Sequence, residues 1–309
     1  MVERIGDQVT KFKVGDPVVC IFGDLLKMGT FAEYGVFLEK ELVRKPNEMS
    51  FECGSVMAGA GMTTMQMCMR HPLIAPVLER EVKRVWNGSG LSPPSDEKKL
   101  LKIVVLGASG GTGCFAVLFC KHFLSRYFQV KVYAVCSERN MKVVKNDLDA
   151  DVVIDYNKTS VSLGTNTIHS DTCPTKSLFQ TIRQDHGEYF IDLVMDCVSG
   201  YYYYDDLCRH MQCVDPVTGN RTVYTTIAPP GSHVLTYSGV LSFAWYFGMN
   251  KIKSWLSSSY PPYYFFSTSP DNPPHLKFVV EEALKEGKAY EKIPLVVFKL
   301  EELNVSLLD

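Results

Sequence analysis

The residues with the clearest chemical meaning lie at 107–113, where the sequence is Gly-Ala-Ser-Gly-Gly-Thr-Gly. An apolar run of strand length, 103–106, precedes them, and a helical pattern follows at 114–127. At such a turn, glycines permit a tight bend and let backbone N–H groups approach a pyrophosphate, while the start of the helix adds partial positive charge. The segment therefore predicts a dinucleotide-binding turn.

The end of the next expected strand, 130–136, bears on which nicotinamide cofactor fits. An acidic residue there holds the ribose diol of NADH, whereas hydroxyl and basic groups admit the 2′-phosphate of NADPH. Ser137, Arg139 and Lys142 follow this strand, with Glu138 among them. We therefore favour NADPH and rank NADH second. In the alternative interpretation, Arg139 and Lys142 form a solvated helix face.

Two other chemistries match part of the sequence and are not favoured. Residues 107–111 fit the Gly-x-Ser-x-Gly pattern of a nucleophilic serine, but 112–113 continue the glycine pattern and no convincing Asp and His partners follow. Cys208, His210 and Cys213 come nearest to a metal cluster, but their spacing on a helix would spread the side chains around its axis. We therefore expect no metal site.

Length and composition set the frame for these residues. The chain has 309 residues, 46% of them hydrophobic, and its formal net charge of -2 gives no strong field to attract nucleic acid. A small-molecule partner is expected instead. Ten cysteines are spread along the chain and the N-terminus shows no secretory signal, which favours reduced thiols and a cytoplasmic location.

Apolar runs that alternate with helical patterns indicate the architecture. From residue 102 onward the alternation of strand and helix predicts an α/β fold with a doubly wound parallel sheet. Helices are expected at 51–70, with a Ser N-cap, and at 114–127, 141–147 and 274–285. Strands are expected at 17–22, 32–37, 102–106, 130–136, 152–155, 190–197, 221–227, 263–267 and 295–298.

Several segments occur in an order that points to a known family. They are 12–18, 29–34, 59–64, 107–113, 149–156 and 196–198. Together they resemble the medium-chain dehydrogenases/reductases, and within them the zinc-independent, quinone oxidoreductase-like branch. The resemblance implies a Rossmann doubly wound parallel sheet beside a GroES-like β domain. It also implies hydride transfer from NADPH to a quinone or an activated double bond, without zinc.

The resemblance assigns cofactor contacts and leaves the catalytic residue unknown. Residues 109–112 correspond to the pyrophosphate turn, Ser137 to the 2′-phosphate position, Tyr156 to the adenosine end, and Thr63 to a cofactor-side contact. In the family, 197–198 and 227–228 follow strands whose ends line the nicotinamide. For Tyr156 and Cys197, core packing is an equal alternative. With the basic residues above, the candidates are Thr63, Ser109, Gly110, Gly111, Thr112, Ser137, Arg139, Lys142, Tyr156, Cys197, Val198, Ile227 and Ala228.

The same resemblance divides the chain into three segments. We expect a partial GroES-like domain at 1–70, a Rossmann cofactor-binding domain at 71–288 and a return to the GroES-like domain at 289–309. The sequence begins just before 11–16 and ends soon after 300–303, where the family has further strands. We therefore expect an incomplete β domain with exposed strand edges.

A second function, of a different class, stays open. Fungal relatives of this branch are linked to sorting or stabilising a membrane ATPase, so the alternative is a catalytically weak or inactive member that acts on a membrane protein. The stretch 234–247 is aromatic and uncharged, and we expect an apolar patch there, at a homodimer contact or a peripheral membrane contact. We favour the enzyme because the glycine turn is intact.

Overall fold

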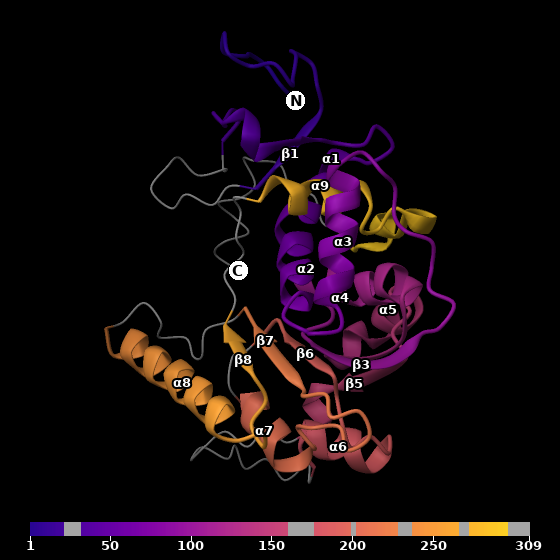
Figure 1. Cartoon of the computed structure of the whole chain (residues 1–309), viewed down its shortest axis with the longest axis vertical. Helices are drawn as coiled ribbons and strands as arrows, with labels where there is room; N and C mark the ends of the chain where they lie inside the picture. Colours follow the sequence, from indigo (N-terminus) through magenta and orange to yellow (C-terminus); the bar gives the residue numbers. More distant parts are fainter. Residues whose placement is uncertain (22–31, 160–175, 199–201, 228–236, 266–271, 296–309) are drawn as a thin grey trace.

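The centre of the molecule is a parallel β-sheet (Figure 1). The computed structural model describes residues 1–21, 32–159, 176–198, 202–227, 237–265 and 272–295. Within them the strands run in the order β5-β4-β3-β6-β7-β8, and β3 pairs with β4 on one side and β6 on the other. Successive strands therefore grow outward from β3 in both directions, which creates a switch point beside it. The strands are β3 (Lys99–Leu106), β4 (Phe128–Cys136), β5 (Val152–Asp155), β6 (Leu193–Asp196), β7 (Val223–Thr226) and β8 (Tyr263–Phe265).

Helices cover both faces of this sheet because alternate strand residues are buried on opposite sides. Ile103 and Val105 join a core with the helices α2 to α5 and α9, whereas Val104 and Leu106 join a second core with α6 and α7. The predicted doubly wound α/β architecture is thereby confirmed. The helices are α2 (Met62–Cys68), α3 (Ala75–Trp86), α4 (Gly111–Leu118), α5 (Met141–Asn146), α6 (Leu178–Asp185), α7 (Tyr202–His210) and α9 (Pro273–Glu281).

The predicted helix at 51–70 consists of α1 (Phe51–Val56), a π-helical turn at Met57–Gly61 and α2. The Ser50 hydroxyl accepts a hydrogen bond from the Cys53 N–H, which is the expected N-cap. A Cβ on Gly61 would lie 2.4 Å from the Val279 side chain and 2.8 Å from that of Phe115. The absence of a side chain at Gly61 therefore allows this run to pack closely on α4 and α9.

The amino-terminal segment contains a small antiparallel pair, β1 (Val18–Cys20) with β2 (Leu42–Arg44). The strand predicted at 32–37 is wrong, because these residues pair with no strand in the described part of the chain and Val36 is 96% exposed. Alternation of residue types does not make a strand where no neighbour accepts its backbone hydrogen bonds. The strand predicted at 295–298 lies almost entirely outside the described residues.

One long helix, α8 (Tyr237–Leu256), projects away from the rest of the molecule next to β8 (Figure 1). Trp245 is 73% exposed and Trp255 is 85% exposed on this helix. Among the helices that the structure describes, none is long and apolar enough to cross a bilayer. Thus α8 presents aromatic side chains at the surface.

Candidate functional site

Two glycines, one between β3 and α4 and the other in the first turn of α4, sit where no other residue fits. Gly107 has a φ of +74°, and a Cβ there would lie 2.3 Å from the Val198 side chain. A Cβ on Gly113 would lie 2.0 Å from the Gly107 carbonyl oxygen. Gly107 thus forms the sharp turn after β3, and Gly113 lets α4 pack directly on the backbone of that turn.

The first turn of α4 is open to a ligand. Gly110 is its N-cap and supplies no side-chain cap, so the first N–H groups of α4 are left for other acceptors. Gly110 and Gly111 are exposed, and a Cβ on Gly111 would meet nothing within 4 Å. Unpaired N–H groups and the helix dipole both favour an anion, so this cradle suits a diphosphate.

The end of β4 is fastened to this turn. The Ala108 N–H donates to the Val135 carbonyl at 2.9 Å, and the Asn140 side-chain amide donates to the Ser109 hydroxyl, also at 2.9 Å. Ser137, the first residue after β4, is half-buried at this edge. The predicted Ser109 and Ser137 therefore lie at the ends of neighbouring strands. Asn140 was missed, although its position within the 137–142 segment was a usable signal.

The basic residues beyond β4 are available to a ligand. Arg139 and Lys142 are exposed and form no ion pair with the residues that the structure describes. Glu138 instead pairs with Lys158 at 3.1 Å, and Lys158 approaches Asp155 at 4.0 Å. Glu138, the acidic residue in this segment, thus pairs with Lys158 and with neither Arg139 nor Lys142 among the described ion pairs.

Tyr156 lies directly after β5 and is 43% exposed, so core packing does not account for its side chain. A pocket of about 420 Å³ opens beside it, lined in part by Asp155, Lys158 and Thr159. Tyr156 lies at the carboxyl edge of the sheet, where ligands of open α/β sheets bind, whereas the pocket extends along the edge strand β5 to Asp185 at the end of α6.

The ends of β6 and β7 complete the edge. The Cys197 N–H donates to the Leu106 carbonyl and the Ile227 N–H donates to the Asp196 carbonyl, each at 3.1 Å. Cys197 and Ile227 therefore continue the row of strand ends that begins at β4. Of the other predicted residues here, Val198 is exposed and Ala228 lies outside the described residues.

A buried carboxylate, Asp196, positions this part of the site. Asp196 accepts a hydrogen bond from the Tyr224 hydroxyl at 2.6 Å and another from the Val198 N–H at 3.0 Å. These bonds hold Val198 where its side chain lies against Gly107.

Burial raises the pKa of the Cys197 thiol, which is therefore neutral at physiological pH. Asp196 was missed by sequence reasoning, although a charged residue inside an apolar strand was a signal.

Thr63 is buried in the helical run that packs on α4. Its hydroxyl donates to the Gly59 carbonyl at 2.8 Å within its own helical run, and the residue is buried. Its neighbour Thr64 reaches the Thr112 carbonyl at 3.5 Å and so touches the first turn of α4. Sequence reasoning missed Thr64. A cofactor contact of Thr63 stays a prediction.

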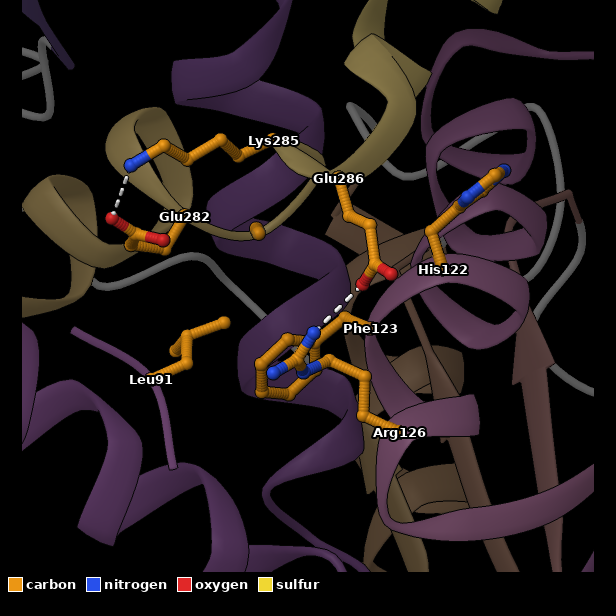
Figure 2. A pocket seen from close by; sticks show the side chains of 8 residues that line it. Leu91, His122, Phe123, Arg126, Glu282, Lys285 and Glu286 are labelled. Atoms are coloured by element: carbon orange, nitrogen blue, oxygen red, sulfur yellow. Dashed lines mark hydrogen bonds and ion pairs between the residues drawn. The ribbon is translucent and has the colours of Figure 1, made fainter. Parts of the chain in front are cut away.

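A second pocket, of about 250 Å³, lies away from this edge (Figure 2). His122 and Arg126 line it from the far end of the helical run that begins with α4, facing Glu282, Lys285 and Glu286. Arg126 pairs with Glu286 at 2.7 Å and Lys285 with Glu282 at 2.9 Å. Because it lies away from the carboxyl edge of the sheet, we assign it no part in cofactor binding.

The cysteine and histidine cluster differs from the expectation that a helix separates its members. Helix α7 ends at His210, and Cys213 lies beyond it, where its thiol contacts the Met211 carbonyl at 4.0 Å. His210 instead approaches Asp206 at 3.5 Å. Within the described residues, no group of three side chains is suited to a metal ion.

Curated proteins with similar sequences are mainly quinone oxidoreductases and trans-enoyl reductases. A chloroplastic quinone oxidoreductase QR1 of Triphysaria versicolor is 36% identical over 155 residues, which are 50% of this chain and 40% of that protein. The chloroplast envelope quinone oxidoreductase homolog of Arabidopsis thaliana is 33% identical over 155 residues, which are again 50% of this chain and 40% of that protein. A trans-enoyl reductase, fsr4, of Gibberella fujikuroi is 26% identical over 157 residues. The matches thus span less than half of each relative's length.

Solved structures share the fold at low sequence identity. The quinone oxidoreductase of Pseudomonas syringae has a TM-score of 0.60 and 18% identity, with 99% of this chain and 74% of that chain covered. A mycobacterial protein, Rv1454c, in complex with NADPH has a TM-score of 0.57 and 16% identity, covering 100% of this chain and 76% of that one. No family model matches the chain.

Proposed function

We propose that this chain, a quinone oxidoreductase-like member of the zinc-independent medium-chain dehydrogenases/reductases, is an NADPH-dependent enzyme that reduces a quinone or an activated double bond. The observation that carries the proposal is the open glycine cradle at the start of α4, at the switch point of the sheet. The names of the relatives support the class of acceptor.

The residues at the carboxyl edge divide the binding of such a cofactor among them. The N–H groups at Gly111 and Thr112, beside the exposed backbone of Gly110, would hold the diphosphate, and Ser137 with Arg139 and Lys142 would hold the 2′-phosphate. Tyr156 would lie toward the adenosine, and Cys197, Val198 and Ile227 toward the nicotinamide. When bound, the nicotinamide supplies the hydride. Asp196 and Tyr224 would keep Val198 in place while this happens.

The proposal includes the domain division expected from the sequence. The pair β1–β2 would belong to a GroES-like domain at 1–70 that is joined by 289–309, with the Rossmann domain at 71–288 between them. A cytoplasmic location is part of the same proposal. Proteolysis with mapped cleavage sites, and fractionation of cells that express the whole protein, test these two points.

Charge at Gly110 tests the diphosphate site. Gly110→Asp places a carboxylate at the N-cap, where Asp favours the helix but repels a diphosphate, and Gly110→Asn adds the same bulk without charge. We expect fluorescence titration to show at least about tenfold weaker NADPH binding for the Asp variant than for the Asn variant. Thermal unfolding should be the same for both. Equal NADPH affinity in the two variants would place the diphosphate elsewhere.

Cofactor preference and turnover complete the test. Arg139→Ala should weaken NADPH binding about tenfold and leave NADH binding unchanged, because only NADPH carries the 2′-phosphate. Lys83→Ala, on the exposed side of α3, is the control and should change neither. Quinones and enones are then screened with NADPH. Absence of turnover with every acceptor would count against the enzyme.

The second candidate function is binding to a membrane protein, with α8 as the contact. Trp245, Ile252, Trp255 and Leu256 are exposed on α8, and no acidic residue occurs in this helix. The last three follow Trp245 by about two to three helical turns, so all four side chains lie along one side of the helix. Such an apolar stripe favours an interaction surface, either for a second copy or at a membrane.

A further inference from the structure

The side chain of Asn140 reaches from the segment after β4 to the glycine turn. Asn140 is the N-cap of α5, a position at which an asparagine side chain commonly accepts from the N–H groups of the first helical turn. Here the side chain makes no such bond, and its amide donates instead to the Ser109 hydroxyl at 2.9 Å. The bond therefore serves the glycine turn and not α5.

The backbone around Ser109 is fixed without help from this side chain. The N–H groups of Ala108 and Gly110, on either side of Ser109, each donate to a backbone carbonyl at 2.9 Å. The Asn140 N–H also donates to a backbone carbonyl at 2.9 Å, so the residue that supplies the amide is held in place as well. The freedom that remains at Ser109 is rotation of its side chain, and the Asn140 amide selects one orientation.

The direction of this hydrogen bond decides where the Ser109 proton can go. A hydroxyl carries one proton and two lone pairs, whereas an amide NH₂ group only donates. Because the Asn140 amide uses a lone pair of the hydroxyl, the proton stays available, and Ser109 makes no other hydrogen bond to the residues that the structure describes. Ser109 is half-buried beside the exposed Gly110, at the open start of α4. Its hydroxyl therefore offers a donor where the cradle suits a diphosphate.

We propose that Asn140 is a positioning residue for the cofactor diphosphate and acts through Ser109. The Asn140 amide orients the Ser109 hydroxyl so that its proton meets a diphosphate oxygen at the start of α4. This inference rests on the proposed function, because a dinucleotide must bind there. It also separates Asn140 from its neighbours in the sequence. Arg139 and Lys142 would serve the 2′-phosphate, which only NADPH carries, whereas the diphosphate is common to NADPH and NADH.

A double-mutant cycle on the two residues tests the route. Fluorescence titration gives the dissociation constants of NADPH and NADH for wild type, Ser109→Ala, Asn140→Ala and the double variant. We expect each single variant to bind NADPH about tenfold more weakly, as for the loss of a hydrogen bond to a charged group. The double variant should bind no more weakly than Ser109→Ala, because Asn140 acts only through that hydroxyl.

The comparison of the two cofactors distinguishes a role at the diphosphate from a role at the 2′-phosphate. Asn140→Ala should weaken the binding of NADPH and NADH by the same factor, whereas Arg139→Ala should weaken that of NADPH alone. Asn140→Asp keeps the size of the side chain but replaces the donor by a charged acceptor, which takes the Ser109 proton away from the ligand. We expect this variant to lose more affinity than Asn140→Ala, for both cofactors.

Asn146→Ala provides the control, because Asn146 is exposed at the other end of α5 and should not affect either cofactor. All these variants should unfold within a few degrees of wild type, since one half-buried hydrogen bond contributes little to the stability of a chain of this length. Losses that add in the double variant, or a loss confined to NADPH, would overturn the role of Asn140 and leave the proposed enzyme intact. A wild type that binds neither cofactor would overturn both.

Discussion

At the scale of single residues, Glu188 links two neighbouring strands through a cluster of charged and polar contacts. Its carboxylate contacts Lys102 of β3 at 2.5 Å, Lys131 of β4 at 2.8 Å and the Tyr133 hydroxyl at 2.7 Å. Burial by itself would raise the pKa of Glu188, but the three hydrogen bonds together lower it to about 2. The charged form of Glu188 is therefore bound to the neighbouring strands β3 and β4.

This cluster predicts a pH-dependent loss of stability in Glu188→Gln. Because the pKa in the folded protein is below the ordinary value of 4.5, the contribution of Glu188 is complete above about pH 4.5 and is lost as the pH falls toward 2. Urea unfolding should show a loss of about 2 kcal/mol at neutral pH, and a smaller loss near pH 3.

A surface pair provides the control for Glu188. Glu286 pairs with Arg126, but the Glu286 side chain is 66% exposed. Glu286→Gln should therefore cost less than about 1 kcal/mol at neutral pH. A Glu188→Gln variant that loses the same stability at both pH values would show that charge is not the cause.

At the scale of elements, the contact between β3 and α4 depends on Gly113. Gly113→Ala puts a Cβ 2.0 Å from the Gly107 carbonyl oxygen and 2.8 Å from the Ala108 Cα, so α4 must move away from the strand end. We expect a loss of about 2 kcal/mol in the free energy of unfolding, measured in urea, because overpacking against backbone is costly. NADPH affinity should fall as well.

Gly111→Ala is the matched control on the same helix. Its Cβ meets open space, so the free energy of unfolding should not fall. Loss of NADPH affinity without loss of stability in this variant would place the cofactor over Gly111. A Gly113→Ala protein as stable as wild type would contradict the close packing of β3 and α4.

The elements also show how far sequence reasoning reaches. The core strand β3 and the glycine turn were predictable from the sequence. The apolar run has the composition of a buried strand, and Gly107 and Gly113 fit both the local turn and the close packing of α4 on it. The strand expected at 32–37 was not, because pairing depends on neighbours that the local sequence does not specify. Thr64 and Asn140 were missed for a similar reason, since only the packing of α2 and the end of β4 brings them to the turn.

At the scale of the whole molecule, the two proposed activities use different parts of the fold. The cofactor edge is formed by strand ends that backbone hydrogen bonds join from β4 to β7. Helix α8 stands outside this row, next to β8 at the edge of the sheet, so a change on its surface should leave the glycine cradle intact (Figure 1). Reductase activity and partner binding can therefore be separated by mutation.

The stripe on α8 predicts that the double variant Trp245→Ser and Trp255→Ser loses an association that wild type makes. Two exposed tryptophans in a helix whose charged residues are Lys251 and Lys253 suit either a second copy or an anionic lipid surface. Sedimentation velocity measures the first, and co-sedimentation with anionic vesicles measures the second. NADPH affinity should not change, whereas Trp86→Ser, on the distant α3, should leave association intact. A monomeric wild type that does not co-sediment with vesicles would exclude self-association and lipid binding as roles of α8.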